Sequence, residues 1–228
     1  KGEGAGVSFD DAQETFTARY THETVALAFA ITEEAIEDNL YDRLAARYTK
    51  ALARSMSNAK QVKSVEPLIN GLPSTATFTS GDGVALFSKV HPTINGTFKN
   101  TLDTQADLNE TSLEQSMIDI AKMTDERGLR IAARGLKMII PSELQFTAER
   151  LMKSQGRTGT ADNDINAIVS MGMIPQGYRV NNYLTDSDAF YILTDVPNGM
   201  KMFTRAPLTT AMEGDFDTGN VRYKARER

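Results

Sequence analysis

The side chains that most often carry out catalysis are scarce in this 228-residue sequence. It contains no cysteine and only two histidines, His22 and His91. A nucleophilic triad needs a base that takes up the proton of the nucleophile, and neither histidine lies in a recognisable nucleophile motif. A zinc-protease pattern is also absent, because His22-Glu23 has no second histidine at the required spacing. We therefore expect packing or surface roles for both histidines, and we expect that the protein is not an enzyme.

Two further patterns resemble ligand sites but lack essential residues. The stretch 162–166 (DNDIN) resembles the start of a calcium loop, yet Ala167 and Met173 stand where the loop needs glycine and glutamate, so we predict a capped turn. The glycine run at residues 2–6 is neither preceded by a strand nor followed directly by a helix, and Glu3 would repel a phosphate. We predict no metal and no cofactor.

Composition indicates a folded, soluble chain. Hydrophobic residues make up 40% and charged residues 24% of the sequence, close to the averages for globular proteins. The longest apolar run, Val25–Ile31, is much shorter than the roughly 20 residues that cross a bilayer, so we expect no membrane segment. The absence of cysteine fits a reducing compartment.

Charge is distributed unevenly along the chain. Residues 1–42 carry a net charge of −8 and residues 43–228 a net charge of +3. Such a chain could dock head to tail on copies of itself, and the acidic balance argues against a dedicated nucleic-acid binder. A solvated acidic face explains the same pattern equally well.

The first regular pattern has a period of two residues from Glu14 to Ile31, which is typical of a strand. Large side chains change sides near Thr24, which indicates a bulge or a twist. At about 3.3 Å per residue this strand would be roughly 60 Å long. We therefore predict an arm that projects beyond its own domain.

A long helix follows. Thr32 is a good N-cap, acids fill the first turns, and apolar residues then recur at helical spacing to Val62. The basic residues come later, an order that complements the helix dipole. We predict one helix from Glu33 to about Lys63, roughly 45 Å long, that ends before Pro67.

The rest of the chain mixes helices and strands, which predicts an α+β protein. We expect a second helix from the Thr111–Glu114 capping box to Gly128, and a third helix from Pro141-Ser142 to Ser154. The predicted strands are Leu136–Ile140, Tyr178–Leu184, Ala189–Asp195, Met200–Ala206 and Asn220–Arg226.

Several stretches resemble the major capsid proteins of tailed bacteriophages, which have the Hong Kong 97 phage capsid fold, in the branch of Mu-like major head proteins. The resemblance covers nearly the whole chain. The stretches that carry it are FTARYTHET (16–24), ITEEAIEDNLY (31–41), TDERG (124–128), QFTAERL (145–151), RTGTADND (157–164), EGDFDTGN (213–220) and YKARER (223–228).

This resemblance implies a division of the chain. Residues 1–31 would belong to the extended β loop, 32–66 to the spine helix of the peripheral domain, 67–208 to the remaining peripheral domain and the axial domain, and 209–228 to a returning peripheral strand. The family's chains begin earlier and continue beyond Arg228, so we expect this sequence to be part of a longer protein.

The resemblance also implies a function. Hexamers and pentamers of identical subunits would close an icosahedral shell around double-stranded DNA, without sequence-specific DNA binding, in a virion assembled in the bacterial cytoplasm. Scaffold, portal or decoration proteins would be further partners. We expect the acidic arm to meet a basic helix surface on a neighbouring subunit; the residues assigned to this interface are Phe16, Arg19, Tyr20, Glu23, Arg43, Arg47, Lys50 and Arg54.

Three alternatives remain at this point. An encapsulin-type compartment would keep the fold and enclose enzymes instead of DNA. The second alternative is a hydrolase that uses Asp162, Asp164 or Asp186 with a metal. The third is a monomeric binding module with a mobile arm, whose mass would not depend on concentration.

Overall fold

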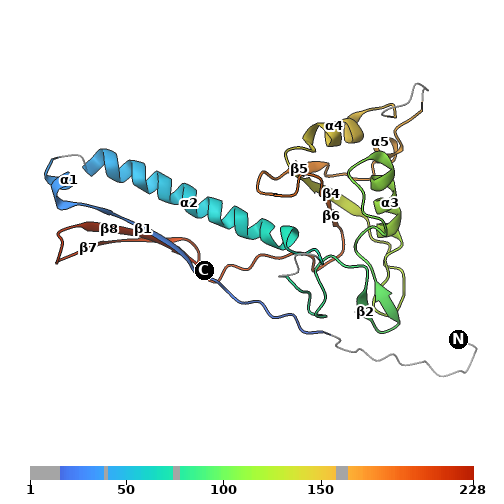
Figure 1. Ribbon diagram of the computed structural model, residues 1–228, viewed down its shortest axis with the longest axis horizontal. Coiled ribbons are helices and arrows are strands. Elements are labelled where there is room, and N and C mark those ends of the chain that lie inside the picture. Colours follow the sequence, from blue (N-terminus) through green and yellow to red (C-terminus); the bar gives the residue numbers. More distant parts are fainter. Residues whose placement is uncertain (1–15, 39–40, 74–77, 158–163) are drawn as a thin grey trace, which may run out of the picture.

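The computed structural model describes residues 16–38, 41–73, 78–157 and 164–228, with only the backbone described for residues 41–43. An elongated layer, made of one long helix on one sheet, projects from a body that contains the remaining helices and strands (Figure 1). This mixture confirms the predicted α+β class.

The projecting layer combines segments from both ends of the described chain. β1 (Val25–Ile31), β8 (Val221–Glu227) and β7 (Thr209–Gly214) form an antiparallel sheet with β8 in the centre. α1 (Glu33–Glu37) lies at the outer end of the sheet, and α2 (Tyr41–Ile69) runs back along it (Figure 1).

A thin apolar seam holds α2 on this sheet. Leu52 and Met56 of α2 are buried against Ala225 of β8, and Val25 and Phe29 of β1 pack beside them. The ring of Phe29 also stacks on Tyr223, with 4.9 Å between the ring centroids. At the inner end, Lys60 of α2 forms an ion pair with Glu227 of β8.

The predicted long strand is shorter in the structure. Only Val25–Ile31 pairs with a neighbour, and residues 16–24 form no strand. Glu14, the predicted start, lies outside the described residues. Alternating side chains favour an extended backbone, but a strand also needs a partner for its N–H and C=O groups, and β8 offers that partner only along β1.

The predicted single helix is divided in two. β1 runs outward and α2 runs back over the same sheet, so the chain reverses around α1, which lies within this reversal. Thr32 is the N-cap as predicted, and its side chain accepts a hydrogen bond from the N–H of Ala35.

The prediction that this helix ends before Pro67 is also wrong. Pro67 lies inside α2, which continues to Ile69. Proline removes one helical hydrogen bond, but Val65 and Leu68 on either side are buried against Leu184, and this packing stabilises the last turn.

The body is built around a second three-stranded sheet. Its central strand is β4 (Gly135–Ile140), which pairs in parallel with β5 (Tyr178–Val180) and antiparallel with β6 (Tyr191–Thr194). The body also contains the hairpin strands β2 (His91–Thr93) and β3 (Gly96–Phe98), and the helices α3 (Glu110–Ala121), α4 (Gln145–Lys153) and α5 (Ala167–Met171). Leu113, Met138 and Ile140 form the centre of its core and are fully buried.

Several local predictions in the body need correction. α3 begins two residues earlier than expected, because the capping box is formed by Asn109 and Ser112, and the helix ends at Ala121. Gly128 instead belongs to a tight turn at positive φ.

The predicted last strands are also only partly right. Residues 200–206 form no strand, while the unpredicted β7 does. Every residue of β7 is exposed. Because the strand buries no face, its sequence (TTAMEG) does not alternate between apolar and polar residues, and sequence reasoning could not detect it. β4 and β8 lie where strands were predicted, whereas β5 and β6 are shorter than predicted. In the described part of the chain, no helix is long and apolar enough to cross a membrane.

The seam predicts how the layer responds to a cavity. We expect Met56→Ala to lower the free energy of unfolding by about 2–3 kcal/mol, because it removes buried methylene groups between α2 and β8. Ser57→Ala, at the neighbouring exposed position, should change it by less than about 0.5 kcal/mol. Urea unfolding followed by circular dichroism checks both values, and equal effects of the two substitutions would contradict the assigned seam.

Candidate subunit interface

The four arm residues predicted for an interface are all exposed. Phe16, Arg19, Tyr20 and Glu23 precede β1 in the segment without strand partners. Two of them contact their own chain: the Tyr20 ring lies 5.2 Å from that of Phe203, and Glu23 forms a 3.0 Å ion pair with Lys63 of α2. These two contacts attach the arm to the base of the layer, and all four side chains remain exposed.

A groove of about 270 Å³ lies where the arm leaves the layer. Residues of the arm, α2, the segment 202–204 and the end of β8 line it, with apolar side chains such as Met56 and Phe203 beside charged ones. Lys63 donates hydrogen bonds to Glu66 and Glu23 here, and these bonds raise its pKa, so it stays cationic at neutral pH. Sequence reasoning missed Lys63 and Phe203 as partners of the arm, because no local signal links positions so far apart.

The helix residues of the predicted interface share one face of α2. Arg47, Lys50 and Arg54 are exposed, and at 100° per residue they lie within about 60° of one another, opposite Leu52 and Met56. Among the described residues, no carboxylate pairs with any of the three. The side chain of Arg43 lies outside the described residues. The structure thus forms a basic helix face, defined here as Arg47, Lys50 and Arg54, on the side of α2 away from the sheet.

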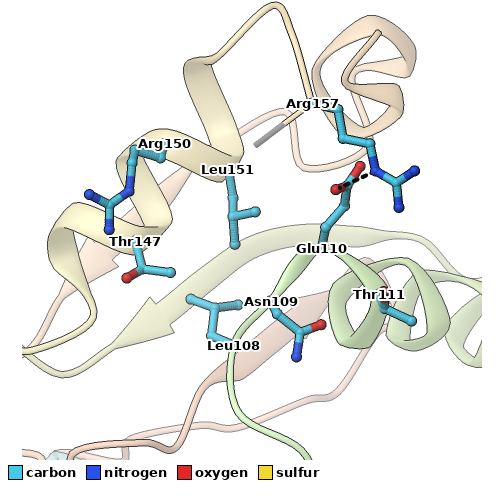
Figure 2. Close-up of a pocket in the computed structure, with 8 residues that line it drawn as sticks. All are labelled: Leu108, Asn109, Glu110, Thr111, Thr147, Arg150, Leu151 and Arg157. Atoms are coloured by element: carbon cyan, nitrogen blue, oxygen red, sulfur yellow. Dashed lines mark hydrogen bonds and ion pairs between the residues drawn. The ribbon is translucent and has the colours of Figure 1, made fainter. Parts of the chain in front are cut away.

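The body contains a larger hollow, of about 500 Å³, between α3 and α4 (Figure 2). Arg157 donates a 3.0 Å hydrogen bond to Glu110 on one side of it, and Arg150 of α4 lies on the other. Leu108 and Leu151 lie between them, and the Asn109 side chain caps α3. The carboxylate in this hollow is thus already paired, and among the described residues that line it no nucleophile lies beside a base. Within the described ranges, no group of three His, Asp or Glu residues is placed to hold a metal ion.

His91 has a buried acidic partner. Its Nδ1 lies 2.6 Å from Oδ2 of Asp82, and both side chains are about nine-tenths buried. Burial would raise the pKa of Asp82, but hydrogen bonds from His91 and from the N–H of Val84 outweigh burial and hold the pKa below its ordinary value. The pair fastens the loop before β2, in agreement with the packing role expected from the sequence.

Asn166 and Asp186 accept hydrogen bonds from nearby backbone N–H groups. Asn166 caps α5 by accepting hydrogen bonds from Ile168 and Val169, as the predicted capped turn requires. Asp186 accepts a hydrogen bond from the N–H of Asp188. Asp162 and Asn163 lie outside the described residues.

These observations describe an α+β protein whose prominent features are exposed charged faces on a projecting layer. Comparison with known proteins agrees with a structural role. The sequence profile of the phage capsid protein family matches residues 14–228. The chain therefore belongs to the phage capsid protein family, which makes it a structural protein of a bacteriophage and a component of the virion.

A solved structure gives a further comparison. A chain in the structure of Mycobacterium phage Che8 is similar to this one with 14% sequence identity and a TM-score of 0.47. The match covers 90% of this chain and 64% of the Che8 chain, so the present chain spans less than two thirds of that structure's length. No curated protein sequence matches.

The ring contact predicts how firmly the arm is attached. We expect Phe203→Ala to increase trypsin cleavage after Arg19 by about two- to tenfold, because an aromatic pair contributes about 0.5–1.5 kcal/mol. Phe216→Ala removes a phenylalanine that is fully exposed in the β7–β8 turn and should leave the rate unchanged. Equal cleavage rates in the two variants would show that Tyr20 does not depend on Phe203.

The low pKa of Asp82 predicts a pH dependence. A carboxyl whose pKa is lower in the folded state than in the unfolded state adds stability above its unfolded pKa, near 4, and this stability is lost as the pH falls through the folded pKa. Asp82→Asn should therefore cost about 1 kcal/mol at pH 7, and the cost should shrink below pH 4. Urea midpoints between pH 7 and pH 2.5 test this, with Asp107→Asn as an exposed control. A cost that stays constant with pH would contradict the assignment.

Proposed function

We propose that this protein is a major capsid subunit of a tailed bacteriophage head with the Hong Kong 97 phage capsid fold, in the Mu-like branch. Hexamers and pentamers of the subunit close an icosahedral shell around double-stranded DNA. The observation that carries the proposal is the projecting layer: one helix on one sheet, with a basic outer face and, at its base, an arm that has no strand partner among the described residues. Such a layer suits contact with neighbouring copies.

In this proposal each part of the chain has a place in the shell. Residues 1–31 belong to the extended loop that lies over a neighbour, and α2, within residues 32–66, is the spine helix. Residues 67–208 complete the peripheral domain and supply the axial domain at capsomer centres, and 209–228 return to the peripheral sheet. The missing strand partners of residues 16–24 support this assignment, because an arm that covers a neighbour leaves its own sheet.

The proposed contact is electrostatic in part. Residues 1–31 carry a net charge of −3, and Phe16, Arg19, Tyr20 and Glu23 lie in the described part of the arm. On the neighbour, the arm meets the basic helix face together with Arg43. Charged contacts at the rim of an interface mainly set encounter rate and partner choice, and a shell gains its stability from many copies of modest interfaces.

The overall charge suits a container for DNA. These 228 residues carry a net charge of −5 and repel phosphates on average, which suits a shell that encloses a genome without sequence-specific binding. Assembly takes place in the host cytoplasm, and scaffold, portal or decoration proteins are the further partners. No observation favours the encapsulin-type compartment.

Charge reversal tests the arm-to-helix contact. We expect Arg47→Glu with Arg54→Glu to raise the concentration needed for assembly about tenfold or more at low salt, with a smaller effect at high salt, where exposed charges are screened. Light scattering gives the mass of the particles, and negative-stain imaging of the same fractions shows whether they are rings or closed shells.

The matched control is Arg47→Lys with Arg54→Lys, which keeps both charges and should assemble like the wild type. Assembly and salt dependence that are unchanged in the charge-reversed variant would exclude this contact. A wild-type protein that forms neither rings nor shells would overturn the proposed function itself.

A further inference from the structure

The face of the β1–β8–β7 sheet that points away from α2 carries a row of cations. Along β8, Ala225 is buried under α2 and Tyr223 stacks on Phe29, so these residues mark the covered face. Side chains alternate along a strand, so the intervening residues Arg222, Lys224 and Arg226 lie on the opposite face. All three are exposed, about 7 Å apart along the strand. We call them the basic stripe.

Small residues border this stripe along β1 and beside Lys224 on β7. On β1, Ala30, Ala28 and Ala26 pair with Arg222, Lys224 and Arg226 in turn, and on β7 Ala211 lies opposite Lys224. These alanines are exposed although their side chains are small and apolar, so no element in the described part of the chain packs over this face. The stripe is therefore an open, flat surface that a partner can approach closely.

The chain itself neutralises one end of the stripe. Arg222 forms an ion pair with Asp215 in the β7–β8 turn. Among the described residues, Lys224 and Arg226 have no acidic partner. Glu213 of β7 pairs with Arg222 and so lies on the same face at that end of the stripe, whereas Arg226 lies about 14 Å further along β8 than Arg222.

A set of acids lies at the outer end of the layer. α1 contributes Glu33, Glu34 and Glu37, followed by Asp38, and the end of the β7–β8 hairpin contributes Glu213, Asp215 and Asp217. The two segments are in contact, because Glu33 lies directly against Gly219 of the turn. We call these seven acids the acidic tip; it lies at the far left of the layer in Figure 1.

We propose that the basic stripe of one subunit binds the acidic tip of a second copy. This inference rests on the proposed function and adds a second contact to it, distinct from the basic helix face. The pairing of Arg222 with Asp215 within one chain already joins these two kinds of surface. Lys224 and Arg226 continue the row of cations and can bind the carboxylates of a neighbouring copy. Because the two surfaces differ, the contact is head to tail and is suited to rings.

Charge reversal on each surface separately gives a sharp test. The stripe variant is Lys224→Glu with Arg226→Glu. The tip variant replaces Glu34, Glu37, Asp38 and Asp217 with Lys, which leaves three of the seven acids and gives the tip a net charge of +1. Each should weaken self-association about tenfold or more at low salt, measured by sedimentation velocity over a concentration series. A control that keeps the charges, Lys224→Arg with Arg226→Lys, should associate like the wild type.

Mixing the two variants provides the decisive measurement. In the mixture, the cationic tip of one variant faces the acidic stripe of the other, and the native tip faces the native stripe, so association should return. A misfolded variant would not be rescued in this way. Failure of the mixture to associate would overturn the proposed contact. Variants that each assemble like the wild type would also overturn it, but they would leave the proposed function standing.

The rival partner is DNA, whose phosphates a row of cations also attracts. Fluorescence anisotropy with a duplex of 30 base pairs distinguishes the two partners. If the stripe variant loses DNA binding but keeps normal self-association, the stripe binds DNA and the proposed contact is wrong. If the wild type does not self-associate at all, the proposed function falls together with this contact.

Discussion

A layer made of one helix on one three-stranded sheet can bury only one face of each, and most of the surface of this protein follows from that constraint. The buried seam between α2 and β8 contains little more than Leu52, Met56 and Ala225, with Val25 and Phe29 beside them. Everything on the outer faces remains in contact with solvent. These faces carry cations, while acids gather on the arm and at the outer end of the layer. Charge rather than apolar area therefore distinguishes the surfaces that a neighbouring subunit meets.

Much of the fold could be predicted wherever a pattern was local. The helical spacing found α2, and Thr32 marked the start of α1, because caps and apolar periodicity are encoded within a few residues. Predictions failed where distant residues decide the outcome. Residues 16–24 alternate like a strand but have no partner, and Pro67 remains inside α2 because Leu184 packs against the turn around it.

The candidate interface was predictable to a similar extent. A spacing of three and then four residues already places Arg47, Lys50 and Arg54 on one helix face, and the structure has them there. The alternation of Arg222, Lys224 and Arg226 carries the corresponding signal for a strand, but the sequence does not say which face of that strand α2 would cover. That assignment required the register of β8 against β1, which joins opposite ends of the chain.

The strand order also has a consequence for how the protein folds during synthesis. β8 is the central strand, and within the described sheet β1 and β7 each pair with β8 alone. A nascent chain that has already produced β1 and α2 therefore lacks this sheet until β8 leaves the ribosome, so the apolar side of α2 stays uncovered while residues 70–220 are synthesised. Joining β1 to β8 is also slow, since non-local pairing must pay its entropy before it gains any contact. The layer that is proposed to build the shell thus forms only after the body between α2 and β7 has been synthesised, which keeps the contact surfaces of the layer incomplete until then.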